Sequence, residues 1–394
     1  MHPSLLTASQ AQVARSARID LSVGYPRLRT SAARLAALRR AISSGGNAWV
    51  WEEEIGRLNA EVATLLGLPV NTEFLVTFSG TTAIGRTLQA LAARREGSVI
   101  VTSPGFDSIA SLAQEATGAV PEVVRRTVFR EDSWIARLLE RIRESDPSVV
   151  LLVSPDNPSG RVLTKNELTT IATACGQART TLVLDQCFAP ITPYGSTVPL
   201  ATSVDGLTDW CLLWDSSKTV ELMGEKVGVI LPSESVRTCV QDSLGILHLD
   251  LPLSSIVAVR RELKVMRTTD GIRSLSDVVA TNASRLRAVA ERVGLTVNEP
   301  DAGSFLLLGV QGTYYEGHAD RLAARLLSKH GVALAHDRLL TLEGHMNGSR
   351  ESYLRVLLAS RLEDINSLCQ GLETELLAAN ARTSPVDIQV TGER

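Results

Sequence analysis

Two ionisable residues of this 394-residue sequence stand directly after apolar segments, where a side chain could take part in chemistry. Lys218 follows the segment DWCLLWDSS at 209–217, and Asp185 ends the segment TTLVLD at 180–185. A lysine at the end of a buried strand loses hydration, which favours the neutral amine that attacks carbonyl carbons. A carboxylate in the same place can hold a protonated ring nitrogen through a charge-assisted hydrogen bond. The alternatives are a solvated loop lysine and an aspartate that caps the following helix.

A short polar turn, SGTT at 79–82, lies between the apolar segment 74–78 and a stretch with helical spacing at 83–94. Backbone N–H groups at the start of a helix, with hydroxyl groups beside them, form a binding site for an anion such as phosphate. Gly80 would let the backbone approach the anion closely because it carries no side chain. The alternative is that Ser79 simply caps the helix.

The apolar segments alternate with helical stretches, as in a sheet that is covered by helices on both faces. Helical spacing of apolar residues is present at 33–44, 54–66 and 83–94. Nearly continuous apolar runs predict buried strands at 74–78, 98–103, 148–154, 180–185, 209–217 and 226–231. The predicted fold class is therefore α/β, with a parallel or mixed sheet.

In such a sheet, ligands bind at the carboxyl ends of the strands. Five residues of chemically complementary types lie at or just past the predicted strand ends: Ser79, Phe106, Asn157, Asp185 and Lys218. One such coincidence means little, but five in one chain are hard to explain by packing alone. We therefore expect these side chains to meet in one site.

A second, smaller domain is predicted in the C-terminal part of the chain. A long helical region at about 254–294 leads into it, and strands are expected near 304–310 and 353–359. The predicted organisation is an N-terminal arm at 1–32, a large domain at 33–262, a small C-terminal domain at 263–378 and a disordered tail at 379–394.

The composition is that of an ordinary globular protein and gives no sign of nucleic-acid or membrane binding. The net charge is −3, hydrophobic residues make up 44% of the chain, and no basic run is present. No apolar stretch approaches the ~18–20 residues that span a bilayer, and the N-terminus lacks an apolar signal core, so we expect a cytoplasmic protein. The five cysteines form no CxxC pair and the six histidines show no metal-ligand spacing, so we expect reduced thiols and no metal site.

Further motifs connect these residues to a known family. Asn157 lies in the motif NPSG, Lys218 follows two serines and precedes GEKVG at 224–228, and Arg355 lies in YLRVLLA. In this order the motifs resemble those of the class I and II aminotransferases of fold type I, which carry pyridoxal 5′-phosphate (PLP). The resemblance covers about residues 19–375. It implies a large PLP-binding domain with a mainly parallel seven-stranded sheet covered by helices, and a smaller α/β C-terminal domain.

By this resemblance, Lys218 carries the cofactor as a Schiff base and is the catalytic residue. Asp185 binds the pyridine nitrogen, Asn157 donates to the ring oxygen O3′, Phe106 stacks on the ring, and the turn at 79–82 binds the phosphate. The full cofactor-binding set that the resemblance implies is Ser79, Gly80, Thr81, Phe106, Asn157, Asp185, Phe188, Ser216, Ser217, Lys218 and Lys226.

The resemblance also implies a substrate site and a partner subunit. Arg355 would grip the α-carboxylate of an amino-acid substrate, and Gly24, in the segment LSVGYP, would lie near that carboxylate. The alternative for Arg355 is an ordinary surface or salt-bridged arginine. Because sites of this fold are commonly completed across a dimer interface, we expect a homodimer, with 248–256 and the region of Trp49 and Trp51 near the partner's cofactor.

Four positions depart from the pattern of the family. Phe188 stands where the family has a tyrosine that donates to O3′, so Asn157 alone would steady that oxygen. Asp215 stands where a serine or threonine touches the phosphate, and Lys226 replaces the arginine that binds it. The segment WVWEEEIG contains no tyrosine, although the family has one in this region.

The most direct interpretation is an aminotransferase, in which Lys218 moves a proton at Cα while Arg355 orients the carboxylate and Asp185 keeps the ring protonated. The altered pocket and the arginine-rich composition motivate an alternative, an antibiotic-biosynthesis or other natural-product enzyme of the same fold. It would catalyse elimination (as a C–S or other lyase), oxidative deamination, decarboxylation or cyclisation of a modified amino acid. A third interpretation is a ligand sensor, but such sensors carry a DNA-binding domain, and only about 30 residues precede the core.

Overall fold

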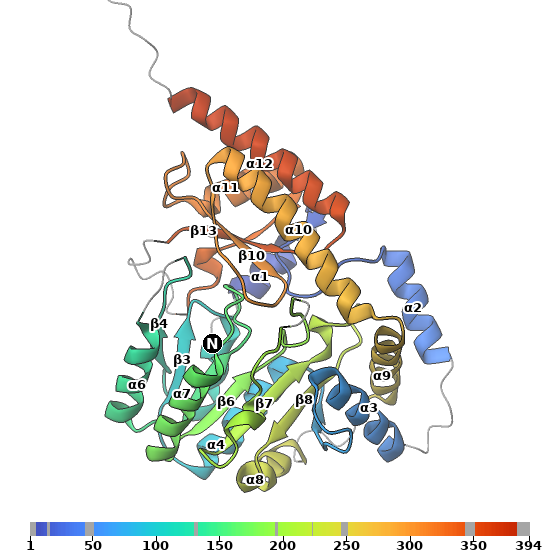
Figure 1. The fold of residues 1–394 in the computed structure, drawn as a ribbon, viewed down its shortest axis with the longest axis vertical. Coiled ribbons are helices and arrows are strands. Elements are labelled where there is room, and N and C mark those ends of the chain that lie inside the picture. Colours follow the sequence, from blue (N-terminus) through green and yellow to red (C-terminus); the bar gives the residue numbers. More distant parts are fainter. Residues whose placement is uncertain are drawn as a thin grey trace, which may run out of the picture.

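Two larger sheets, a two-stranded sheet and the helices packed on them make up the described part of the protein, as the computed structural model shows in Figure 1. The structure describes residues 5–13, 16–43, 51–129, 133–193, 196–222, 224–245, 251–342 and 351–383. A seven-stranded sheet occupies the lower part of the view, a four-stranded sheet lies above it, and α12 (Leu362–Thr383) lies at the top. None of the helices in these described ranges is long and apolar enough to cross a membrane.

The strands of the large sheet are β2 (Leu75–Thr77), β3 (Val99–Ser103), β4 (Glu122–Arg125), β5 (Val149–Val153), β6 (Thr181–Asp185), β7 (Trp210–Asp215) and β8 (Gly228–Pro232). They lie in the order β2-β8-β7-β6-β5-β3-β4. Among them, β8 runs antiparallel to its two neighbours, and the other adjacent pairs are parallel. This arrangement confirms the predicted α/β fold with a mainly parallel seven-stranded sheet.

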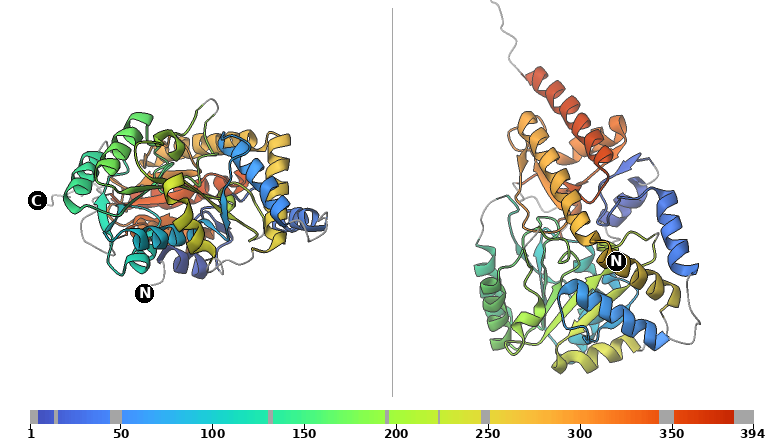
Figure 2. Two further views of the ribbon diagram at one scale, coloured as in Figure 1. Left: turned by 90° about the horizontal axis from the view of Figure 1, so that it is seen from below. Right: turned by 45° about the vertical axis from the view of Figure 1, so that its right-hand side comes forward.

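Successive side chains of the central strands point to opposite faces of the sheet, so each strand contributes to two apolar cores. Val149 and Leu151 of β5 join one core, whereas Val150 and Leu152 join the core on the other face. The first face is covered by α4 (Gly80–Arg94), α5 (Ser108–Thr117) and α8 (Glu234–Gly245), and the second by α3 (Trp51–Leu66), α6 (Trp134–Ser145), α7 (Lys165–Gln177) and α9 (Leu253–Thr268). The left view of Figure 2 shows these two helix layers from below.

The small sheet is antiparallel and has its own apolar core. Its strands are β9 (Thr296–Val297), β10 (Phe305–Gly309), β12 (Ala335–His336) and β13 (Tyr353–Leu357), in the order β12-β13-β10-β9. Its helices are α10 (Gly271–Val293), α11 (Ala319–Arg325), the π-helical segment Leu326–His330, and α12. Leu286 of α10, Leu308 of β10 and Val356 of β13 are fully buried in this core.

The N-terminal segment joins the core of the small sheet. β1 (Ile19–Asp20) pairs in parallel with β11 (Val332–Ala333), and Leu21 and Val23 are buried in the same core. The remaining elements are α1 (Leu5–Val13), α2 (Ser31–Ser43) and the 3-10 turns η1 (Ala201–Val204), η2 (Ser216–Lys218) and η4 (Asp337–Leu339). The segment that holds Gly24 is thereby fixed next to the small sheet.

Three predictions differ from the structure. The helical region expected at about 254–294 is two helices, α9 and α10, because the chain turns at Asp270, whose φ of 53° is left-handed. No strand is expected at β4 from the sequence, because at this sheet edge only Val124 is buried and the apolar signal is weak. The tail predicted from 379 is wrong at its start, since α12 continues through Thr383, and residues 384–394 lie outside the described residues. The domain boundaries themselves stay predictions.

Asp337 in η4 is a half-buried carboxyl group whose Oδ1 has no hydrogen-bond partner. Burial raises its pKa to about 6, against the opposing effects of the Tyr353 backbone N–H and the charge of Arg338. The folded state therefore keeps a proton that the unfolded state releases near pH ~4. The stability that this proton confers is complete below about pH 4 and is lost as the pH rises through about 6.

We expect Asp337→Asn to raise the free energy of unfolding by about 1–3 kcal/mol at about pH 8 and to change it little near pH ~4.5. The amide stays neutral at both pH values and keeps an acceptor for the Tyr353 N–H. Urea unfolding at the two pH values measures the effect, with Asp277→Asn on the exposed side of α10 as the matched control. A variant that is less stable than the wild type at the higher pH would contradict this account.

Candidate active site

Five of the predicted site residues meet where the carboxyl edge of the large sheet faces the small sheet. Asp185 ends β6, Asn157 lies in the turn after β5, and Lys218 ends η2, which follows β7. Because β5, β6 and β7 are parallel neighbours, their carboxyl ends lie side by side. The small sheet contributes Arg355 from β13, and the N-terminal segment contributes Gly24.

The amine of Lys218 lies beside Gly24 in this site. The side chain is half-buried, and among the described residues its Nζ makes no hydrogen bond or ion pair. A Cβ added to Gly24 would lie 3.5 Å from this Nζ and 3.6 Å from Cζ of Phe305. Both distances are ordinary van der Waals contacts, so an alanine would fit at position 24, whereas a larger side chain would crowd the amine.

Asp185 is a buried carboxylate that accepts a hydrogen bond from the N–H of Cys187 at 3.1 Å. Burial raises the pKa of Asp185, while the hydrogen bonds from Cys187 and the positive charge of Lys218 oppose the rise. No ion pair to Asp185 is present in the described part of the chain. A cationic N–H group of a ligand would therefore stabilise the ionised carboxylate.

The guanidinium of Arg355 is buried without a carboxylate partner among the described residues. Its Nη1 donates to Asn157 Oδ1 at 2.7 Å, and its Nη2 donates to the carbonyl oxygen of Ser22 at 2.6 Å. The group lies 4.3 Å from the centre of the Phe305 ring, and Nε has no partner. Burial lowers the pKa to about 10, which leaves the group cationic at neutral pH. A buried cation with a free donor suits an anionic ligand such as a carboxylate.

Two contacts of Arg355 are not predicted from the sequence. Ser22 offers only its backbone carbonyl, which carries no residue-type signal. Phe305 is placed by strand register, because β10 and β13 pair Phe305 with Leu357 and Leu307 with Arg355. Phe305 and Arg355 are therefore diagonal neighbours in the sheet. The sequence shows two apolar runs that could pair as strands. It does not predict the register that places Phe305 beside Arg355.

The N-terminal helix α1 contacts the same region. Gln10 Nε2 donates to the Ser22 carbonyl at 2.7 Å, and the Leu6 N–H donates to Asp107 Oδ2 at 3.0 Å. The Ser22 carbonyl is thus shared between Gln10 and Arg355. No motif in the predicted arm indicates these contacts, because α1 is short and only weakly amphipathic.

The polar turn at 79–82 begins α4, and Ser79 caps the helix. The Ser79 Oγ accepts from the N–H of Thr82 at 3.1 Å, as the capping alternative predicts. The side chain of Thr81 is exposed. The hydroxyl of Ser79 therefore already serves the helix, and the backbone donors of the turn decide whether an anion can bind there.

The carboxylate of Asp215 occupies a backbone donor of this turn. Its Oδ2 accepts from the N–H of Gly80 at 2.6 Å, and its Oδ1 accepts from the N–H of Ser217 at 2.7 Å. The Gly80 N–H is one of the groups that the family resemblance assigns to the cofactor phosphate. Asp215 thus points towards the turn to which the resemblance assigns the phosphate, rather than away from it.

The other predicted phosphate contacts differ in their burial and in their bonding partners. Ser216 is fully buried, and its Oγ accepts from the N–H of Val227 at 2.9 Å. Ser217 is half-buried and uses its N–H for Asp215. Lys226 is exposed, and within the described ranges it has no hydrogen-bond or ion-pair partner. Their assignment as phosphate ligands stays a prediction.

The predicted aromatic residues differ in their surroundings. Phe106 is half-buried and packs against the core on the α4 side of the large sheet and against a smaller core that includes Leu307 and Tyr353 of the small sheet. Phe188 is buried and meets Phe305 edge to face, with ring centres 5.2 Å apart. Trp49 and residues 248–250, which are expected near a partner's cofactor, lie outside the described residues.

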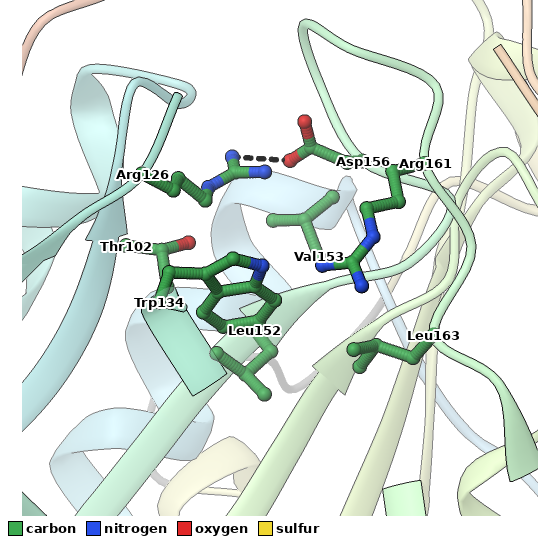
Figure 3. A pocket seen from close by; sticks show the side chains of 8 residues that line it. All are labelled: Thr102, Arg126, Trp134, Leu152, Val153, Asp156, Arg161 and Leu163. Carbon is green, nitrogen blue, oxygen red and sulfur yellow. Dashed lines mark hydrogen bonds and ion pairs between the residues drawn. The ribbon is translucent and has the colours of Figure 1, made fainter. Parts of the chain in front are cut away.

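A small cavity lies beside the turn after β5, as Figure 3 shows. Arg126 forms a buried ion pair with Asp156, and the Arg161 guanidinium lies 5.4 Å from the centre of the Trp134 ring. The cavity measures about 10 Å³, roughly the room of one water molecule. It is too small for an amino acid, so we interpret these contacts as the support of the turn that carries Asn157.

Comparisons with known proteins identify the family. The sequence profile of aminotransferase class I and II matches residues 17–372. This chain belongs to the class I and II aminotransferase family. This chain is 27% identical over 257 residues to kynurenine--oxoglutarate transaminase 3 of Rattus norvegicus, and the match covers 61% of this chain. The match spans 56% of the rat enzyme, so just over half of that relative is represented.

Two further comparisons cover nearly the whole chain. A probable aspartate aminotransferase of Methanocaldococcus jannaschii is 23% identical over 369 residues, covering 90% of this chain and 92% of that protein. The crystal structure of an aminotransferase from Mycobacterium tuberculosis superposes with a TM-score of 0.78 at 19% identity, covering 96% of this chain and 97% of that one. The first likeness supports the family, and the second confirms the fold. These names do not favour the alternative of elimination, oxidation or cyclisation.

Proposed function

We propose that the protein is a PLP-dependent aminotransferase that transfers the amino group of an amino acid to a keto acid. One observation carries the proposal: the unpartnered amine of Lys218 lies in one site with the buried carboxylate of Asp185 and the buried guanidinium of Arg355. Family membership and the transaminase names of the relatives support the same reaction.

The residues at one end of the site fit the aromatic ring of PLP. Asp185 can hold a protonated pyridine nitrogen, because it is buried and has no ion pair among the described residues. Asn157 gives its Oδ1 to Arg355, which leaves Nδ2 to donate to the ring oxygen. Lys218 is free to attach the aldehyde carbon. Bound PLP would supply an electron sink for the electron pair of the broken Cα–H bond.

The side chains divide the work of the reaction among them. Arg355 binds the α-carboxylate through its free Nε and thereby turns Cα towards the amine of Lys218. Once the substrate amine has displaced it from the cofactor, Lys218 would remove the proton from Cα and return a proton to the carbon that had carried the aldehyde. Asp185 stays ionised and keeps the proton on the ring nitrogen. Gly24 leaves the space beside the amine that these movements need.

We extend the proposal to the setting of the enzyme. Its substrate is an amino acid, its location is cytoplasmic, and its site is completed across a homodimer. Trp51 begins α3, and the described part of 248–256 begins at Leu251. Both segments are those that the family resemblance brings near the partner's cofactor.

A single-turnover experiment tests the proposed reaction. The PLP-loaded protein is mixed with a panel of amino acids without any keto-acid acceptor, and products are followed by mass spectrometry. We expect one equivalent of keto acid per subunit, with the amino group retained on the bound cofactor until an acceptor keto acid is added. Ammonia release or oxygen uptake without retention of the amino group would contradict the proposal and favour the lyase or oxidase alternative. Light scattering of the same sample reads the oligomeric state, where a monomer would contradict the proposed dimer.

A further inference from the structure

Asp215 holds the place at the start of α4 where an anion would bind. Its side chain is only 4% exposed. One carboxylate oxygen accepts from the Gly80 N–H and the other from the Ser217 N–H. Backbone N–H groups at a helix start are the donors that a phosphate would use. In this chain, a carboxylate of its own already uses one of these donors, the Gly80 N–H.

Close packing keeps this carboxylate in place. A Cβ on Gly80 would lie 3.0 Å from both Cβ and Oδ2 of Asp215. Gly228 is the β-sheet partner of Asp215, and a Cβ there would lie 2.4 Å from the carbonyl carbon of Ser79. The turn and the ends of β7 and β8 therefore interlock. A phosphate group cannot reach the Gly80 N–H unless the carboxylate of Asp215 moves.

The amine of Lys218 is a positive charge near Asp215 and Asp185, but it makes no ion pair with either of them among the described residues. Within the described residues it has no ion pair. The carboxylate of Asp185 adds a second negative charge nearby. Lys226, which replaces the phosphate arginine of the family pattern, is exposed and has no ion pair among the described residues. A phosphate dianion beside Asp215 would therefore be repelled by a like charge in a buried setting.

We propose that Asp215 is a specificity-determining residue that makes the site hold its cofactor by the pyridine ring, with little contribution from the phosphate. This inference rests on the proposed use of PLP. The site then discriminates weakly between PLP and pyridoxal, which has the same ring and aldehyde but no phosphate. Removing the charge of Asp215 removes its repulsion of a phosphate, and a shorter side chain such as serine also frees the Gly80 N–H, so that the start of α4 becomes a phosphate site.

The test compares the wild type with Asp215→Asn, which removes the charge, and Asp215→Ser, which also makes room. Asp242→Asn on the exposed side of α8 removes one charge elsewhere and is the matched control. Absorbance titration gives Kd values for PLP and for pyridoxal with each protein. Thermal unfolding with and without inorganic phosphate probes the turn in the absence of cofactor. Pyridoxal binding reports whether the ring pocket is intact in each variant.

We expect the wild type to bind PLP and pyridoxal within about tenfold of each other. Both Asp215 variants should tighten PLP on the order of tenfold to a hundredfold and leave pyridoxal within about twofold. Inorganic phosphate should stabilise the two variants against heat but not the wild type or Asp242→Asn.

Four results would overturn the inference. A wild type that strongly prefers PLP to pyridoxal, with variants that bind PLP less tightly, would make Asp215 part of the phosphate site. Variants that change PLP and pyridoxal binding equally would show that Asp215 acts on the ring pocket. If the wild type binds PLP but inorganic phosphate stabilises neither variant, the inference about Asp215 is wrong and the proposed cofactor stands. If the wild type binds neither PLP nor pyridoxal, the proposed cofactor is wrong as well.

Discussion

Lys218→Ala abolishes covalent attachment of PLP and lowers kcat/KM for transamination by at least about 10²–10⁴-fold, the usual contribution of a general base. The reason is that no other lysine can replace it. The chain has five lysines, and Lys165, Lys226, Lys264 and Lys329 are all exposed, whereas Lys218 is half-buried beside Gly24. Attachment is measured by borohydride reduction followed by mass spectrometry of the intact protein.

Two further variants make the Lys218 test specific. Lys218→Arg keeps the positive charge but not a neutral amine, so it should lose attachment and turnover as fully as the alanine variant. Lys264→Ala, on the exposed side of α9, should retain both. If PLP still became covalently bound to the alanine variant, or if the arginine variant kept its turnover, Lys218 would be a structural residue and the proposed reaction would lose its base.

Arg355→Met lowers kcat/KM for amino acids on the order of 10²–10³-fold, as expected for the loss of one partner of a buried charge pair. Its Nε has no partner in the unliganded site, so the donor is available for the substrate carboxylate. The same variant should not be less stable without substrate. A buried guanidinium with no carboxylate partner among the described residues costs hydration that methionine does not need.

The measurement separates carboxylate recognition from a general defect. A primary amine without a carboxylate should react with the wild type and with Arg355→Met within a fewfold of each other. Arg321→Met, an exposed arginine on α11, serves as the control for both kinetics and stability. Equal losses with the amine and with the amino acid, or a clear fall in the thermal midpoint, would mean that Arg355 supports the site through Asn157 and Phe305 instead.

The strand ends of the large sheet are the part of the site that the sequence predicts well. Asp185 and Lys218 each follow a run of apolar residues that is buried in the sheet. Such runs are a local signal, because a strand that is covered on both faces is apolar at nearly every position. Parallel neighbours then bring their carboxyl ends together whatever the details of the connections. The same reasoning explains why β4 is not predicted. It lies at the edge of the sheet, where only Val124 is buried and the apolar run is weak.

Side-chain direction is the part that local patterns leave open. The sequence flags Asp215 as an unusual neighbour for a phosphate, yet either orientation of its carboxylate is compatible with the pattern. The structure decides this through contact with Gly80, which lies 135 residues earlier in the chain. The hydroxyl of Ser216, a predicted phosphate ligand, is likewise taken by the backbone of Val227 across the β7–β8 pair.

The sequence by itself therefore determined the α/β fold, the family and the identities of Lys218, Asp185 and Asn157 as candidates, because each depends on short apolar runs and compact motifs. Only the tertiary structure decided that Arg355 lies buried on Asn157, 198 residues away, and that its counter-ion is missing among the described residues. Such contacts depend on the register of distant strands and on how two sheets meet. Neither the strand register nor the arrangement of the two sheets can be predicted from any one segment of the chain.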